Sequence, residues 1–262
     1  MTYHDVSEIT EAAGKIKSLR LVRNWDPGCS TATPTNVDYR MGKLVEAGIL
    51  RGTWLDYGCA DGSYTVALVR KGASGAVGFD VLHDRIALAE KRYHDIPNVQ
   101  FLCSSDGTVS VPDNYFDGIF MNEVMEHVTD ESKTLSEFRR ILRPGGHLVV
   151  ISPNRWFPFE CHGARVGKFN LGFPVPVLPW LPEAVGQRFM VARNYWPSEL
   201  AHLVRDFGFR LLSVGFVWPV LEVHAWLPSP LIRLYQKRVT TFDKLPFIRR
   251  FGVSTVVIAT KT

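Results

Sequence analysis

The chain has 262 residues, of which 46% are apolar and 21% are charged, and its formal net charge is +4. This composition excludes a disordered or fibrous chain and predicts one compact domain that spans residues 1–262. The four cysteines have neither paired spacing nor zinc-ligand spacing, which argues against a disulfide framework and a structural zinc site.

The N-terminal residues lack a charged start followed by an apolar segment, so no signal peptide is predicted. We therefore expect a cytoplasmic protein in a reducing compartment, with the inner face of the membrane as the alternative location. Charge is uneven: residues 1–150 hold 16 basic and 20 acidic residues (net −4), and residues 151–262 hold 14 and 6 (net +8), which sum to +4. A basic, aromatic half suits nucleic acid, an anionic membrane or an anionic substrate, and a solvated basic face is the alternative.

Helices and strands are expected to alternate over residues 36–152. The expected helices cover residues 36–48, 63–71, 84–93 and 131–142, and the expected strands cover residues 53–57, 76–80, 99–103, 116–121 and 147–152. This alternation predicts an α/β fold with a parallel sheet that is covered on both faces. Two final strands are expected at residues 209–217 and 254–260.

The first strand ends in Asp56 and leads into a Gly-x-x-x-Gly turn formed by Gly58 and Gly62. Glycine at these positions lets the backbone approach a ligand closely and turn tightly into a helix. A dinucleotide loop would read Gly-x-Gly-x-x-Gly and would direct helix N–H groups at a pyrophosphate, so an acid here disfavours a phosphate. Asp80 ends the second strand, where an acid accepts hydrogen bonds from both ribose hydroxyls. Together these acids suit a nucleoside that carries an ammonium group.

Three later segments extend the pattern: Pro-Asp-Asn-Tyr-Phe-Asp at 112–117, Glu-His-Val at 126–128, where a helix is expected to start, and Leu-Arg-Pro-Gly-Gly-His-Leu-Val-Val at 142–150. In these motifs the chain resembles the class I S-adenosylmethionine-dependent methyltransferases, in particular the type 11 and ubiquinone-type small-molecule O-methyltransferases. The resemblance implies a Rossmann-like seven-stranded sheet of order 3-2-1-4-5-7-6 with the last strand antiparallel. It also implies S-adenosyl-L-methionine as the cofactor, bound by a core of residues 36–152.

The resemblance places cofactor contacts at the ends of the first four strands. Ala60 stands where the family usually has a third glycine. Residues 101–107 lie where the family places an acid against the adenine amino group, and the spacing to Pro112 makes Asp106 the first candidate and Ser105 the second. The expected cofactor-binding residues are Asp56, Gly58, Cys59, Ala60, Gly62, Asp80, Val81, Ser105, Asp106 and Asn122.

Two insertions interrupt the family plan. Residues 153–197 contain seven prolines, which prevent long helices and inner strands, so we expect a lid-like insertion over a pocket. Residues 218–252 form a basic aromatic insertion, in which residues 226–238 predict an amphipathic helix with cations toward its end. This insertion is too interrupted to span a bilayer, and we expect peripheral membrane contact or, alternatively, a cap on the core or on a second subunit. The oligomeric state is left open.

Catalysis requires alignment of a nucleophile with an already activated sulfonium methyl group. A hydroxyl nucleophile also benefits from a base, and His127 and His162 are the candidates, each of which could instead only shape the pocket. Glu123 and Glu126 with His127 also suggest a metal site, because ubiquinone-type family members have a similar Glu-x-x-Glu-His run. Residues three and four apart share a helix face without any metal, so no metal is assigned. Further candidates for substrate contact are Asn154, Arg155, Trp156, Arg193 and Tyr195.

The sequence thus predicts methyl transfer to a hydroxyl of a small or amphiphilic molecule, such as a sugar, a glycolipid or a quinone-like lipid. The alternatives are N-methylation of an amino sugar or amine, and a protein that binds the cofactor without catalysis. Nucleic acid is a less favoured substrate, because residues 121–124 lack the Asn/Asp-Pro-Pro-aromatic run of enzymes that methylate amino groups of bases.

Overall fold

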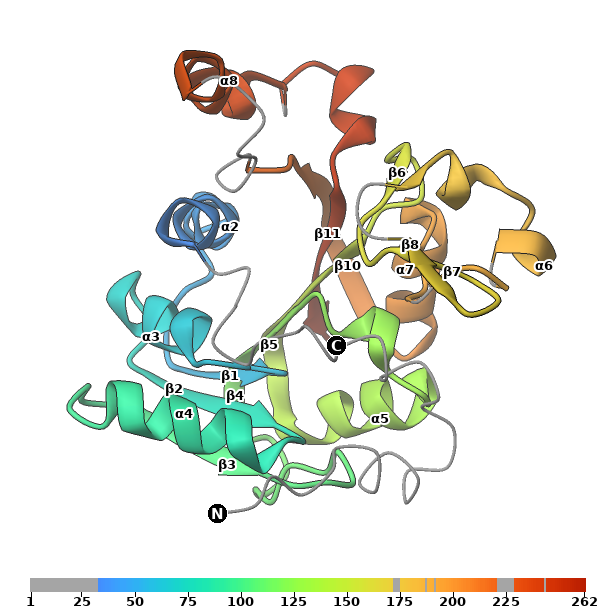
Figure 1. The fold of residues 1–262 in the computed structure, drawn as a ribbon. Coiled ribbons are helices and arrows are strands. Elements are labelled where there is room, and N and C mark those ends of the chain that lie inside the picture. The colour runs from blue at the N-terminus through green and yellow to red at the C-terminus, as the bar shows by residue number, and fades with distance from the viewer. Residues whose placement is uncertain (1–32, 172–174, 187, 191, 221–228, 243) are drawn as a thin grey trace.

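The computed structural model describes residues 33–171, 175–186, 188–190, 192–220, 229–242 and 244–262. Its centre is a seven-stranded sheet of order β10-β11-β5-β4-β1-β2-β3 (Figure 1). Strands β1 to β5 are parallel, whereas β11 pairs antiparallel with both β5 and β10. The predicted order is confirmed, since β10 and β11 are the sixth and seventh strands of that plan. The strands are β1 Thr53–Tyr57, β2 Gly75–Asp80, β3 Val99–Cys103, β4 Phe116–Asn122, β5 Leu142–Pro153, β10 Phe209–Val217 and β11 Ser254–Lys261.

Helices cover both faces of this sheet, each through an apolar stripe. Residues of α2 and α3 join one buried cluster with Trp54 and Phe120, and residues of α5 and α7 join the other with Leu55 and Ile119. Neighbouring strand residues thus point to opposite faces, as the two-residue period of a strand requires. The main helices are α2 Pro34–Glu46, α3 Ser63–Arg70, α4 His83–Tyr93, α5 Glu131–Ile141 and α7 Pro197–Asp206.

Local signals explain where these helices begin. The Thr33 hydroxyl accepts a hydrogen bond from the Asn36 backbone N–H, and Pro34 occupies the first helical position of α2. The Asp130 carboxylate accepts from the backbone N–H of Lys133 and so caps α5. The Glu-His-Val segment does not start this helix: Met125–His127 form a single 3₁₀ turn, η2, and α5 begins at Glu131. That correction matters for the site, because η2 directs its side chains independently of α5.

The segment between β5 and α7 contains only short elements in its described part. Strand β6 (Phe159–Glu160) pairs with β9 (Val175–Pro176), and β7 (Ala164–Val166) pairs with β8 (Phe169–Leu171). The 3₁₀ turn η3 (Leu178–Trp180) and the helix α6 (Glu183–Gly186) follow. These lengths agree with the effect expected of seven prolines. The division into a core of residues 36–152 and insertions at 153–197 and 218–252 stays a prediction.

The second insertion contains α8 (Ser229–Phe242) and the 3₁₀ turn η4 (Ile248–Phe251), which lie together at one end of the molecule (Figure 1). The predicted amphipathic helix over residues 226–238 overlaps α8, although residues 221–228 lie outside the described part of the chain. Among the described residues, none of the helices combines the length and hydropathy needed to cross a bilayer.

Candidate functional site

The loop after β1 approaches both neighbouring strands. The backbone N–H groups of Gly58 and Cys59 donate to the Phe79 carbonyl at 2.7 and 2.9 Å, which ties the loop to β2. Gly58 has a φ of +82°, and a Cβ there would lie 2.3 Å from the Val124 side chain just beyond β4. Glycine is therefore required at this close approach. Ala60 adopts the left-handed conformation at φ +47°, so it keeps a backbone form in which glycine is more common.

Gly62 begins α3 and also depends on its missing side chain. Its φ is +79°, and a Cβ would lie 2.8 Å from the Phe101 ring. Gly58, Ala60 and Gly62 thus form one tight turn against the carboxyl ends of β2 and β4. Such a turn leaves backbone groups accessible to a ligand at the edge of the sheet.

Asp80 links the loops after β1 and β2. One carboxylate oxygen accepts from the Ala60 backbone N–H at 3.1 Å and from the Arg85 guanidinium at 3.2 Å, and the other accepts from the Leu82 backbone N–H at 3.0 Å. The side chain is almost fully buried, while the neighbouring Val81 is exposed. A ribose that binds Asp80 must share this carboxylate with Arg85, which the sequence did not indicate.

Asp56 is buried beneath the start of α3. Its carboxylate accepts a hydrogen bond from the Thr65 hydroxyl at 2.6 Å. Burial raises the pKa of Asp56 to about 7, and the negative charges of Asp80 and Asp61 add to this rise. The hydrogen bond from Thr65 acts in the opposite direction and lowers the pKa. Asp56 is therefore tied to the first turn of α3 through Thr65, and an ammonium group that binds Asp56 would share the carboxylate with Thr65.

The loop after β3 contains the two candidates for adenine recognition. Asp106 accepts from the Ser104 hydroxyl at 2.6 Å and from the backbone N–H and hydroxyl of Thr108 at 2.9 and 3.1 Å. These bonds lower the pKa of Asp106 to about 2. Its carboxylate thus closes its own turn, while Ser105 is exposed. Both residues stay candidates for adenine recognition.

The end of β4 is held by a buried arginine from α2. Arg40 donates to the Asn122 side-chain oxygen at 2.6 Å and to the Glu123 carboxylate at 2.7 Å, and the Ser254 hydroxyl also donates to Glu123. Although burial alone would raise it, these partners hold the pKa of Glu123 below its ordinary value. Asn122 and Glu123 are therefore fixed in position, and the negative charge of Glu123 acts on both Glu126 and His127.

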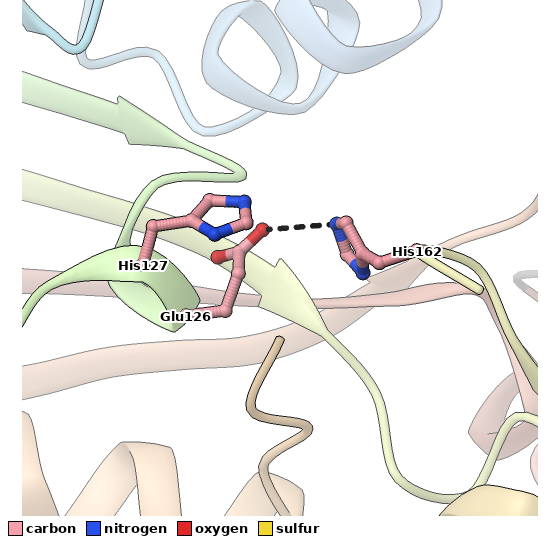
Figure 2. A group of neighbouring side chains, drawn as sticks. All are labelled: Glu126, His127 and His162. Carbon is pink, nitrogen blue, oxygen red and sulfur yellow. Dashed lines mark ion pairs between the residues drawn. The ribbon is translucent and has the colours of Figure 1, made fainter. Parts of the chain in front are cut away.

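Glu126, His127 and His162 form a separate cluster (Figure 2). Glu126 and His127 come from η2, whereas His162 follows β6 in the first insertion. The His162 Nε2 lies 3.8 Å from Glu126 Oε1, and the two imidazole rings meet edge to face with centroids 5.3 Å apart. The structure thus brings together the two histidines predicted from separate loops. It adds Glu126 as the acid between them.

Glu126 has one engaged and one unengaged oxygen. Oε2 accepts from the Ser152 hydroxyl at 3.0 Å, whereas Oε1 is buried without a hydrogen-bond partner among the described residues. Burial raises the pKa of Glu126 well above its ordinary value, and the Glu123 charge adds to the rise. A buried oxygen of this kind is costly unless something binds it, so it marks a position for a ligand, a proton or an ion.

His162 is oriented by a second buried acid. Its backbone N–H donates to Glu160 Oε1 at 2.8 Å, and its Nδ1 lies 3.2 Å from the same oxygen. Glu160 is itself held by the Asn194 side-chain amide. An Nδ1–H that donates to Glu160 leaves Nε2 as an acceptor that faces Glu126. His127 is more exposed than His162. The buried part of its ring loses hydration, and this loss, together with the nearby charge of a protonated His162, lowers the pKa of His127.

The cluster has the donor set of a divalent-cation site. One ligand atom each from Glu126, His127 and His162 lies within 4.8 Å of the other two. Two imidazoles and a carboxylate suit transition metals and leave coordination positions open. Glu123, part of the sequence-based metal hypothesis, is instead paired with Arg40. The expectation that the protein uses no metal stays a prediction.

The remaining candidates for substrate contact are mostly engaged within the protein. Arg155 donates to the carbonyls of Pro179 and Leu181 at 2.9 and 2.8 Å, which fastens the first insertion to the end of β5. Arg193 and the Tyr195 hydroxyl both bond Glu131 at 2.6 Å. Trp156, by contrast, is 40% exposed and remains available to a ligand.

The sheet order and the glycine turn next to two acids are typical of Rossmann-like proteins that bind a nucleoside at the carboxyl edge of the sheet. Comparison with known proteins agrees: residues 55–150 match the family described as "Methyltransferase domain". A demethylmenaquinone methyltransferase of Symbiobacterium thermophilum is 28% identical over 186 residues, which cover 62% of this chain and 72% of the relative. A ubiquinone biosynthesis O-methyltransferase of Acinetobacter baylyi is 27% identical over 187 residues, which cover 66% and 70%.

Solved structures show the same fold. A crystal structure of an S-adenosylmethionine-dependent methyltransferase from Mesorhizobium loti has a TM-score of 0.56 and 16% identity, and the match covers 86% of this chain and 98% of that one. The PH0226 protein from Pyrococcus horikoshii has a TM-score of 0.59 and 14% identity, with 95% and 100% covered. Residues 55–150 therefore carry a methyltransferase domain, the fold is that of S-adenosylmethionine-dependent methyltransferases, and the expected cofactor S-adenosylmethionine agrees with these relatives and structures.

Proposed function

We propose that this methyltransferase acts on a hydroxyl of a quinone-like or related amphiphilic molecule. The observation that carries the proposal is Glu126 Oε1, which is buried without a hydrogen-bond partner in the described part of the chain and lies 3.8 Å from Nε2 of the oriented His162. The relatives that are named for menaquinone and ubiquinone biosynthesis support the quinone-like class of acceptor. Sugars and glycolipids with an acidic or accessible hydroxyl are the other acceptors of this kind.

The cluster supplies a base for the transfer. The acceptor oxygen attacks the methyl carbon, the bond between that carbon and the sulfonium sulfur breaks, and the hydroxyl proton passes to His162 Nε2. Glu160 holds Nδ1 and stabilises the imidazolium that forms. Glu126 Oε1, 3.8 Å from His162 Nε2, borders the same position. His127 borders the position with the edge of its ring.

A divalent cation is the alternative way to activate the hydroxyl. Glu126, His127 and His162 would hold it, and a bound cation would lower the pKa of a coordinated hydroxyl. The two hypotheses differ in their response to a chelator. With His162 as the base, enzyme that has been treated with EDTA and desalted keeps its activity. Loss of activity that returns on addition of Mg²⁺ or Mn²⁺ would instead support the cation.

Incubation with methyl-labelled cofactor and reduced, hydroxylated quinone analogues tests the function. We expect a labelled methyl ether, and His162→Ala should lower turnover about 10²–10⁴-fold while cofactor binding is retained. His202→Ala, an exposed position on α7, is the matched control and should keep wild-type turnover.

The labelled product decides between the possible reactions. Label on a ring carbon would instead identify C-methylation, a reaction named for one relative from Cupriavidus metallidurans. Label on nitrogen of an amine or amino sugar would support N-methylation. Label in none of the lipid, glycan or amine fractions would contradict the proposal and favour a protein that binds the cofactor without catalysis.

A further inference from the structure

An exposed face of the second insertion combines apolar and basic side chains. Its apolar members include Leu231, Leu234 and Phe247, which are 56%, 55% and 71% exposed. Exposed large apolar side chains that cluster next to cations mark a site of interaction with another molecule or a membrane. We use the name α8–η4 face for the exposed apolar and basic residues of α8, η4 and the loop between them, which are Leu231, Leu234, Leu245, Phe247 and Ile248 with Arg233, Lys237, Arg238, Lys244 and Arg250.

One side of α8 packs on the protein. The Tyr235 hydroxyl donates to the Pro219 carbonyl at 2.8 Å, the Phe242 ring contacts Trp218 at 5.0 Å between centroids, and Val239 is buried. Leu234 lies off this packed side, whereas Leu231, four residues before Tyr235, lies at its margin in the first turn of α8, and both side chains are more than half exposed. The helix thus packs on the protein through Tyr235, Val239 and Phe242 and leaves Leu231 and Leu234 exposed.

Cations flank these exposed leucines. Lys237 and Arg238 follow Leu234 by three and four residues, which places them beside it on the helix surface. Residues 223–262 contain seven lysines and arginines and a single acid, Asp243. Arg249 does not belong to the face, because it donates to the Val214 carbonyl at 3.1 Å and lies over the Phe216 ring. The excess of positive charge makes an anionic surface the complementary partner.

The face is connected to the edge of the sheet that holds the site. The Asn154 side-chain amide, directly after β5, donates to the carbonyls of Arg250 and Gly252 at 2.7 Å each, which fixes η4 at that edge. A row of aromatic rings leads from the face to Trp156. The ring centroids of Phe247 and Phe251 are 5.9 Å apart, and those of Phe251 and Trp156 are 6.2 Å apart. Figure 1 shows α8 and the red turn that precedes β11 at the same end of the molecule.

We propose that the α8–η4 face docks on the surface of an anionic lipid bilayer. The leucines and Phe247 enter the headgroup region, and Arg233, Lys237 and Arg238 contact lipid phosphates. The docking stands on its own. A consequence of it, that an amphiphilic acceptor passes from the bilayer along Phe247, Phe251 and Trp156 to His162, rests on the proposed function.

Sedimentation of the full chain with lipid vesicles tests the docking. We expect binding to vesicles of phosphatidylglycerol and phosphatidylcholine, little binding to phosphatidylcholine alone, and a marked loss in high salt because the attraction is screened. The double variant Lys237→Glu with Arg238→Glu should weaken binding at least about tenfold, since each cation near an anionic surface contributes about 1 kcal/mol. The double variant Leu234→Ser with Phe247→Ser should weaken binding at both salt concentrations.

The matched control changes the same net charge elsewhere. Arg70→Glu with Lys91→Glu alters two cations on α3 and α4, and it should bind anionic vesicles like the wild type. Equal loss of binding in both charge variants would show that net charge alone attracts the protein and would overturn the proposal. Absence of wild-type binding to anionic vesicles would overturn it as well.

Two further measurements separate the remaining outcomes. In analytical ultracentrifugation, a dimer that Leu234→Ser with Phe247→Ser converts to a monomer would identify the face as a contact between two copies, against the proposal. The His162→Ala variant should sediment with vesicles like the wild type although it lacks methyl transfer. Docking and catalysis can therefore fail independently of each other.

Discussion

Asp80 offers the most direct test of cofactor binding by a single side chain. Its carboxylate stands at the end of β2 and already accepts hydrogen bonds from Ala60 and Arg85. Asp80→Ala should weaken S-adenosylmethionine binding by about 1–3 kcal/mol, because the paired acceptors for the ribose hydroxyls are lost. Isothermal titration calorimetry measures this change, and Asp84→Ala, at an exposed position in the first turn of α4, serves as the control. An unchanged affinity in Asp80→Ala would show that another residue recognises the ribose.

Asp56 predicts a specific dependence of stability on pH. Its pKa is raised from 3.8 to about 7 in the folded protein by burial, with the charges of Asp80 and Asp61 adding to the rise. The folded state therefore binds more protons than the unfolded state between these values, so stability falls as pH rises from about 4 to 7. Asp56→Asn removes that titration and should raise the urea midpoint more at pH 8 than at pH 5. Equal changes in midpoint at both pH values would contradict a raised pKa.

The residues of the site were predictable to different degrees. His127 and His162 could be chosen because each follows a strand whose carboxyl end faces the cofactor. Glu160, which orients His162, and Ser152, which holds Glu126, could not, because their roles depend on contacts that only the folded insertion creates. Asp106 shows another limit: the motif suggests adenine recognition, which stays a prediction, and the hydrogen bonds that engage its carboxylate in a local turn could not be predicted.

At the scale of elements, Arg40 joins the first described helix to the centre of the sheet. It lies on the apolar stripe of α2 beside Met41 and Leu44. A cation on an apolar stripe is the one sequence signal for its buried ion pair with Glu123, which is 83 residues away. Arg40→Met should destabilise the protein by about 3 kcal/mol, because the Glu123 charge is left buried without its partner. Urea unfolding measures the loss. The double variant Arg40→Met with Glu123→Gln should recover part of it, and additive losses would contradict the coupling.

Most strands could be predicted to within a residue, because each is a short apolar run between glycine, proline or acidic turns. Strand β5 differs: it begins at Leu142 rather than 147, since Leu142 pairs with Phe116 before the register shifts toward Gly118. The short strands of the first insertion were not predicted individually. Proline-rich sequence excludes long elements, but the pairing of β6 with β9 is long-range and leaves no periodic pattern.

At the scale of the whole molecule, the two differently charged halves of the chain meet at the site. The acidic half, residues 1–150, supplies the glycine turn, Asp80 and η2, whereas the basic half supplies His162 and the α8–η4 face. Strands β10 and β11 from the basic half complete the same sheet, and the buried clusters include residues of both halves. A shared sheet and core of this kind should unfold as one cooperative unit.

Cofactor binding should therefore stabilise the whole chain rather than its first half. S-adenosylmethionine at about 100 times its dissociation constant adds about 2.7 kcal/mol to the free energy of unfolding, which for a chain of this size raises the melting temperature by about 5–10 °C. Differential scanning calorimetry should show a single transition that shifts as a unit. Asp80→Ala at the same cofactor concentration should show a smaller shift, because less cofactor is bound. Two transitions, of which only one responds to the cofactor, would show that the basic half folds separately and would contradict a single domain over residues 1–262.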